Sequence, residues 1–178
     1  MTTRAALVSL ALIASATAAL PLAPGPAGGG ARVALVKMPY PGERHLPERS
    51  EGPDALEQGG LATLLEGRGC RMGPVATVAL SAEEQKSYGE WNRLALANGQ
   101  LAKIVAQRRK DGEVPVGLLA NCSSMVGMLG GLQHSGPTDR PLRVGLVFID
   151  AHGDFNTPET TLSGMLGGMP VLFARSPS

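Results

Sequence analysis

Three short runs of almost wholly apolar residues alternate with longer amphipathic stretches along this chain. The runs are Arg32–Met38, Val114–Ala120 and Val144–Ile149. Apolar runs of this length, with little polar alternation, are typical of strands that are buried on both faces of a parallel sheet. A weaker signal over Met72–Leu80 predicts one more strand.

Helical signals fill the intervals between the apolar runs. A helix is predicted over Pro53–Arg68, because proline suits a first helical turn and Gly69 can end the helix. Ser81–Glu84 forms a capping box, and Trp91–Arg109 carries apolar side chains at helical spacing. A small-residue helix is expected from 124 to 132. Strands and helices that alternate at this spacing predict an α/β fold with a parallel sheet.

Polar residues follow the last apolar run directly. Asp150, His152 and Asp154 occupy alternate positions, so in an extended segment their side chains would point the same way. In α/β folds ligands bind at the carboxyl ends of the strands, where segment 121–124 would also lie. Two carboxylates and an imidazole suit a divalent ion such as Mn, Fe, Co or Zn. The alternative is a polar turn with a surface histidine.

Composition narrows the class of protein. The chain has 178 residues, of which 43% are hydrophobic, and this is enough for one domain with a sizeable core. A net charge of +1 argues against a nucleic-acid-binding surface. The basic cluster Arg108–Lys110 fits the C-terminal end of a helix. Cys70 and Cys122 form neither a disulfide framework nor a paired zinc motif.

The N-terminal thirty residues differ from the rest. Met1–Ala19 has one arginine, an apolar stretch and an Ala-x-Ala-like site, which together outline a secretory signal peptide. Pro21–Gly30 is a Gly/Pro-rich linker. We therefore expect a leader and linker over 1–30, a folded domain over 31–178 and export, with a cytoplasmic location as the alternative. The leader is too short to predict a membrane span, so no membrane association of the mature form is expected.

Residues 150–170, DAHGDFNTPETTLSGMLGGMP, resemble the arginase–agmatinase (ureohydrolase) family, which carries an Asp-Ala-His-x-Asp-x-Asn-Thr-Pro segment. Residues 51–69 are similar to an early helix of that family. The resemblance runs from Arg32 to the C-terminus. It implies a three-layer α/β/α fold around a central parallel sheet, incomplete at the C-terminus, and a homo-oligomer.

The same resemblance implies a hydrolase with a binuclear centre, usually of manganese, that cleaves a guanidinium C–N bond and releases urea. A metal-bridging hydroxide attacks the guanidinium carbon. Asp150 matches a bridging carboxylate and His152 a ligand to one metal. Asp154 matches a ligand to the other metal that also orients the hydroxide, which makes it the catalytic candidate. Asn156 and Ser163 match positions that bind the amino-acid end of a small guanidino substrate.

The chain departs from the family pattern in three places. Asn121 and Cys122 stand where the family has an Asp-His pair. A Cys122 thiolate favours Zn or Fe over Mn, although a small cysteine without a role is the alternative. Gly167 replaces a histidine of arginases, and a later Asp-rich metal segment is absent. The main interpretation is an N-terminal fragment of a metal-dependent hydrolase. The alternative is a catalytically inactive family member that serves assembly or regulation.

Overall fold

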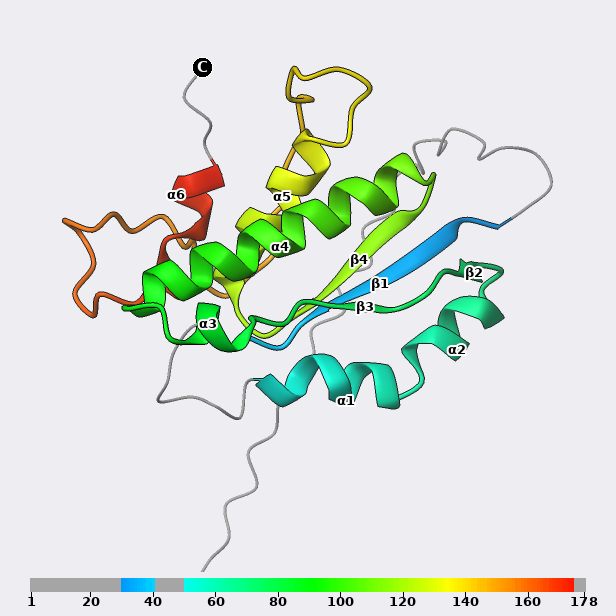
Figure 1. The fold of residues 1–178 in the computed structure, drawn as a ribbon, viewed down its shortest axis with the longest axis horizontal. Helices are drawn as coiled ribbons and strands as arrows, with labels where there is room; N and C mark the ends of the chain where they lie inside the picture. Colours follow the sequence, from blue (N-terminus) through cyan, green and yellow to red (C-terminus); the bar gives the residue numbers. More distant parts are fainter. Residues whose placement is uncertain (1–29, 41–49, 175–178) are drawn as a thin grey trace, which may run out of the picture.

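The structure is a computed structural model that describes residues 30–40 and 50–174. Its centre is strand β1, Arg32–Met38, which matches the first predicted strand. Four of its residues, from Val33 to Val36, are buried in succession, because β1 has neighbours on both faces and both edges. The other strands of the described sheet all pair with β1, and helices lie on both faces of that sheet (Figure 1).

All the strand pairs of the described sheet are parallel. Strand β4, Val114–Leu119, runs along β1 over six residue pairs, from Val33↔Val114 to Met38↔Leu119. Two very short strands, β2 (Arg71–Met72) and β3 (Ala76–Thr77), pair with the beginning and the end of β1. The weakly predicted strand over Met72–Leu80 is therefore two brief contacts with β1. Parallel pairing was the expected arrangement, and it is confirmed.

Helices cover both faces of the sheet, so the fold has three α/β/α layers (Figure 1). Alternate residues of β1 point to opposite sides. Val33 and Leu35 pack with α2, Leu61–Gly67, whereas Val36 and Met38 pack with the long helix α4, Glu90–Lys110. Each face of one apolar strand thus supplies the centre of a separate hydrophobic cluster.

The predicted helix Pro53–Arg68 is divided in the structure. It forms α1, Gly52–Gln58, and then α2, with Gly59 and Gly60 between them. Gly60 has a φ of 87°, which an L side chain adopts only with strain, so the glycine pair ends one helix and redirects the next. The Nζ of Lys37 holds α1 against the sheet at 2.7 Å from Asp54 Oδ1. This hydrogen bond and another to Glu57 raise the pKa of Lys37.

The other helical predictions are confirmed. Ser81 caps α3, Ala82–Gln85, with both hydrogen bonds of the capping box, and the basic cluster Arg108–Lys110 occupies the last turn of α4. Helix α5, Met125–Gln133, follows a short 3-10 turn, η2 (Cys122–Ser124), and packs along α4. After a long irregular segment, η3 (Leu166–Gly168) and α6 (Pro170–Ala174) end the described chain.

The predicted strand Val144–Ile149 does not form. The segment is irregular, and within the described chain no backbone hydrogen bond involves its residues. Val147 is 86% exposed and Ile149 is 92% exposed, so the expectation of burial on both faces is wrong. The physical reason is that a strand exists only beside another strand. The sheet ends at β4, which pairs with β1 alone, and the segment has no strand of the described residues next to it.

The leader and linker predicted over 1–30 lie, up to residue 29, outside the described residues. Within 30–40 and 50–174, no helix combines the length and the apolar character needed to cross a bilayer.

Candidate metal centre

The turn after β4 carries the first residue of the candidate site. Asn121 precedes η2, and its side-chain Oδ1 accepts a hydrogen bond from the backbone nitrogen of Ser124 at 3.1 Å. Its Nδ2 donates to the backbone oxygen of Tyr40 at 2.7 Å, which ties the turn to the end of β1. Asn121 therefore fixes the position of Cys122, the next residue. The predicted site did not include this positioning role, although asparagine is a common cap residue.

Asp150 comes from a distant part of the chain to lie beside this turn. The Sγ of Cys122 donates a hydrogen bond to Asp150 Oδ2 at 3.7 Å, across 28 residues of sequence. Asp150 Oδ1 accepts from the backbone nitrogen of His152 at 3.0 Å. That backbone hydrogen bond lowers the pKa of Asp150. Segments 121–124 and 150–156 thus approach each other, although the adjacent strand that was expected to bring segment 150–156 there does not form.

Asp154 is the buried member of the site, with 8% of its surface exposed. Its φ of 50° lies in the left-handed region, which aspartate tolerates better than most residues. Its Oδ2 is fully buried and has no hydrogen-bond partner. Burial, followed by the negative charge of Asp150, raises the pKa of Asp154. A buried carboxylate oxygen without a partner is costly, which indicates that something else satisfies it.

Cys122, Asp150 and Asp154 converge. One ligand atom from each, the sulfur and two carboxylate oxygens, lies within 4.8 Å of the other two. Burial and the two neighbouring carboxylates raise the pKa of the Cys122 thiol. A divalent cation would reverse this electrostatic situation, since it would pair with both carboxylates and with Asp154 Oδ2. The donor set therefore fits a metal ion.

His152 is placed differently from its two aspartate neighbours. Its side chain is 82% exposed, and its Nδ1 lies 3.6 Å from Asp150 Oδ1. The chain bends at residues 151 and 152, so the strict alternation expected of an extended segment does not hold there. His152 stands at the rim of the convergent group rather than within it.

The remaining predicted residues line the same hollow. Asn156 and Ser163 share it with the three convergent residues. The backbone nitrogen of Asn156 donates to the oxygen of Gly168 at 3.0 Å, and Ser163 Oγ accepts from the backbone nitrogen of Met165 at 3.2 Å. Phe155, which is 62% exposed, also lines the hollow, and no sequence pattern marked it.

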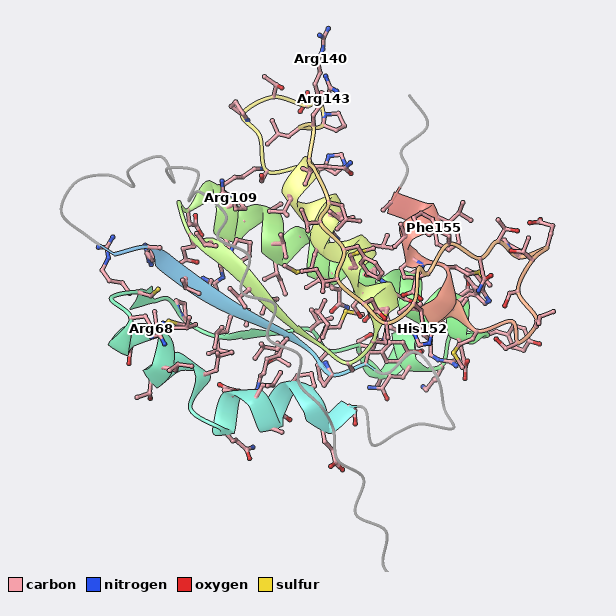
Figure 2. All side chains as sticks on the ribbon, turned by 180° about the vertical axis from the view of Figure 1, so that it is seen from behind. Arg68, Arg109, Arg140, Arg143, His152 and Phe155 are labelled. Carbon is pink, nitrogen blue, oxygen red and sulfur yellow. The ribbon has the colours of Figure 1, made fainter. Side chains whose placement is uncertain are left out.

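The hollow lies at the carboxyl ends of β1 and β4. Figure 2 shows His152 and Phe155 beside α6 at that end of the sheet, with Arg68 and Arg109 at the opposite end. Ligands of α/β folds bind at this edge, so the location agrees with the general rule.

The chain is similar to proteins of a known family. A family model described as the arginase family matches residues 31–177. Human mitochondrial arginase-2 is 30% identical over 148 residues, and the match covers 79% of this chain and 40% of the relative. Human arginase-1 is 32% identical over 133 residues, covering 69% of this chain and 38% of the relative. The chain thus spans about 40% of the length of these curated relatives.

Solved structures of arginases are similar to this chain in fold. The arginase from Bacillus caldovelox matches with a TM-score of 0.65 at 28% identity, over 79% of this chain and 48% of that one. The arginase from Bacillus subtilis matches with a TM-score of 0.65 at 25% identity, over 79% of this chain and 45% of that one.

Proposed function

Because this chain belongs to the arginase family, we propose that it carries part of the active site of a metal-dependent hydrolase that cleaves a guanidinium C–N bond and releases urea. The observation that carries the proposal is the convergence of Cys122, Asp150 and Asp154, with a buried and unpartnered oxygen on Asp154. Ureohydrolase-type chemistry at the family level follows from membership. The substrate, the metal and the residue roles are the proposal.

The residues of the site would have different roles, according to where they lie. Asp150 and Asp154 would hold the cation, with Cys122 as a third donor. A bound divalent ion supplies Lewis-acid charge and lowers the pKa of a water molecule so that it becomes a nucleophile at neutral pH. Asp154 would orient that water. His152, exposed beside Asp150, would be a further donor at the rim of the site.

Residues at the rim of the hollow would recognise the substrate. Asn156 and Ser163 offer short polar side chains on an irregular segment, which suit the orientation of a small guanidino compound. The resemblance to arginases favours a binuclear manganese centre and a homo-oligomer. Cobalt, iron and zinc are the other ions that these donors accept.

Metal content tests the proposal on the chain as it exists. The purified protein, loaded in turn with Mn²⁺, Co²⁺, Fe²⁺ and Zn²⁺ and then dialysed, should retain metal. Asp150→Ala should lose most of it, whereas Asp139→Ala, an exposed carboxylate outside the site, should not. Equal metal retention by Asp150→Ala and the unmodified chain would overturn the assignment.

Urea release tests the chemistry separately. The loaded protein is assayed against arginine, agmatine and guanidinobutyrate. Release that depends on metal and disappears in Asp154→Ala supports the proposed reaction. Metal retention without urea release from any of the three would reject that reaction for this chain and leave the metal centre standing.

A further inference from the structure

Cys122 adds a soft sulfur donor to a proposed metal site whose other donors are hard carboxylate oxygens. Its Sγ is held 3.7 Å from Asp150 Oδ2 by the turn that Asn121 caps. Thiolate ligands select Zn²⁺ and other borderline ions, whereas carboxylates alone suit Mn²⁺. The residue at 122 is therefore in a place to decide which ion the site prefers.

The separation of these two atoms agrees with zinc. With a Zn–S distance of about 2.3 Å, a Zn–O distance of about 2.1 Å and a tetrahedral angle, the sulfur and the oxygen of two zinc ligands lie about 3.6 Å apart. The structure has them at 3.7 Å. The third donor, on Asp154, completes a group whose atoms lie within 4.8 Å of one another, so a small inward movement brings all three onto one ion.

Asp154 gives independent support for a cation at this point. Its Oδ2 is fully buried and without a hydrogen-bond partner, and the residue as a whole is more than nine-tenths buried. Leaving such an oxygen unsatisfied is costly, and the Cys122 thiol has a single proton, which it donates to Asp150. A cation between the three groups satisfies the oxygen that the thiol cannot.

We propose that Cys122, Asp150 and Asp154 form a zinc position, with three protein ligands and an open fourth place, in which the Cys122 thiolate confers selectivity for Zn²⁺ over Mn²⁺. Three protein ligands and a free position are the pattern of catalytic zinc. When the ion binds, the S–H bond of Cys122 breaks, a sulfur–metal bond forms and the proton passes to solvent. This inference rests on the proposed metal centre and specifies its ion.

The test compares affinities for two ions in matched variants. Cys122→Ser replaces the sulfur with a hard oxygen of similar size, and Cys70→Ser is the control for the other free cysteine, which packs beside the Val33–Leu35 cluster. Zn²⁺ and Mn²⁺ dissociation constants are measured by competition with a chelating dye. Cys122→Ser should weaken Zn²⁺ binding by ~10-fold or more, since loss of groups outside the ligand shell already costs this much. Mn²⁺ binding should change far less, and Cys70→Ser should leave both affinities unchanged.

A spectroscopic measurement reads the sulfur bond directly. Co²⁺ is added in place of Zn²⁺, because a thiolate bound to Co²⁺ gives an intense near-ultraviolet charge-transfer absorption that oxygen ligands do not give. The band should be present in the unmodified chain and in Cys70→Ser, and absent in Cys122→Ser. Circular dichroism confirms that each variant is folded, which is expected because Cys122 lies at the exposed face of the turn.

The outcomes separate this inference from the proposed function. If Asp150→Ala abolishes metal binding but Cys122→Ser keeps both the Zn²⁺ affinity and the Co²⁺ spectrum, the zinc position is rejected and the metal centre stands. If Asp150→Ala leaves metal binding unchanged, the metal centre itself fails. Loss of Zn²⁺ affinity and of the band in Cys122→Ser, with Mn²⁺ affinity retained, establishes the inference.

Discussion

Gly131 of α5 lies so close to Val105 of α4 that a β-carbon on the glycine would stand 2.6 Å from the Cβ of Val105. The two helices therefore touch backbone to side chain at this point. A second contact is made by Asn98 Oδ1, which accepts a hydrogen bond from the backbone nitrogen of Gly127 at 2.8 Å. The small residues of α5 thus allow it to pack close to α4.

Gly131→Ala should destabilise the protein, because the added methyl group must push α5 away from α4. Overpacking of this kind costs about 1–3 kcal/mol. Gly130→Ala is the matched control, since its nearest neighbour would be Ala102 Cβ at an ordinary 3.8 Å, and alanine favours a helix over glycine by about 0.5–1 kcal/mol. Urea unfolding checks both variants. A Gly131→Ala variant as stable as Gly130→Ala would contradict the close packing.

Two valines with opposite burial test the position of the irregular segment. Val36→Ala should cost about 2–3 kcal/mol, because Val36 is 0% exposed in the centre of β1. Val147→Ala makes the same change at a side chain that is 86% exposed, and it should alter the unfolding free energy by less than about 0.5 kcal/mol. Similar losses in the two variants would instead favour the buried strand that the sequence predicted.

The capping box of α3 makes a local contribution to stability. Ser81→Ala should lower the unfolding free energy by about 0.5–2 kcal/mol, because Ser81 Oγ accepts from the backbone nitrogen of Glu84 at 3.2 Å. Denaturant unfolding at neutral pH measures the loss. No change in the unfolding midpoint would mean that the α3 region is not part of the cooperative unit.

The second hydrogen bond of the capping box, from the backbone nitrogen of Ser81 to the Glu84 carboxylate, depends on pH. The backbone N–H of Ser81 lowers the pKa of Glu84. A lowered carboxyl pKa contributes stability above the unfolded value of about 4.3, and this contribution is lost as the pH falls through the folded pKa. Glu84→Gln keeps the hydrogen-bond acceptor without the titration. The stability advantage of the unmodified chain over Glu84→Gln should therefore shrink below about pH 4. An advantage that does not vary with pH would contradict the assignment.

Asp154 should reduce stability when no metal is present. In a chelator at neutral pH, Asp154→Asn should be more stable than the unmodified chain by about 1–3 kcal/mol, since it removes a buried, unpartnered charge. Asparagine also tolerates the φ of 50°, whereas Asp154→Ala does not and should gain less. Zn²⁺ at 1,000 times the dissociation constant should reverse the order, because the unmodified chain then gains about 4.1 kcal/mol of binding energy that Asp154→Asn lacks. Thermal unfolding with and without metal measures both effects.

Elements that depend on local signals were predictable. β1 and β4 follow from almost wholly apolar runs, and the end of α4 follows from its basic last turn. The failure at Val144–Ile149 has a different cause, because strand formation needs a hydrogen-bonding neighbour and the apolar run carries no information about one. The glycine pair Gly59–Gly60 was a local signal for a helix break that the apolar periodicity of the segment concealed.

The candidate site, like the fold, was only partly predictable from the sequence. The approach of Cys122 to Asp150 was expected from two adjacent parallel strands that end at one edge of the sheet. Only Cys122 follows such a strand, β4, whereas Asp150 reaches the same place on an irregular segment. The burial of Asp154 and the exposure of His152 do not follow from strand positions, because they depend on a bend at 151–152 and a left-handed φ at Asp154. Backbone conformations of this kind are set by packing that a three-residue motif does not encode.

The central position of β1 also determines how this chain folds in time. Val33 pairs with Val114, 81 positions away, and no pair of strands in the described sheet is joined by a hairpin. Long loops must close, at a cost in chain entropy, before these strand pairings can stabilise the chain. Folding is therefore slow. During that delay the apolar segment 144–149 is open to other chains, so the yield of refolded protein should fall steeply as its concentration rises.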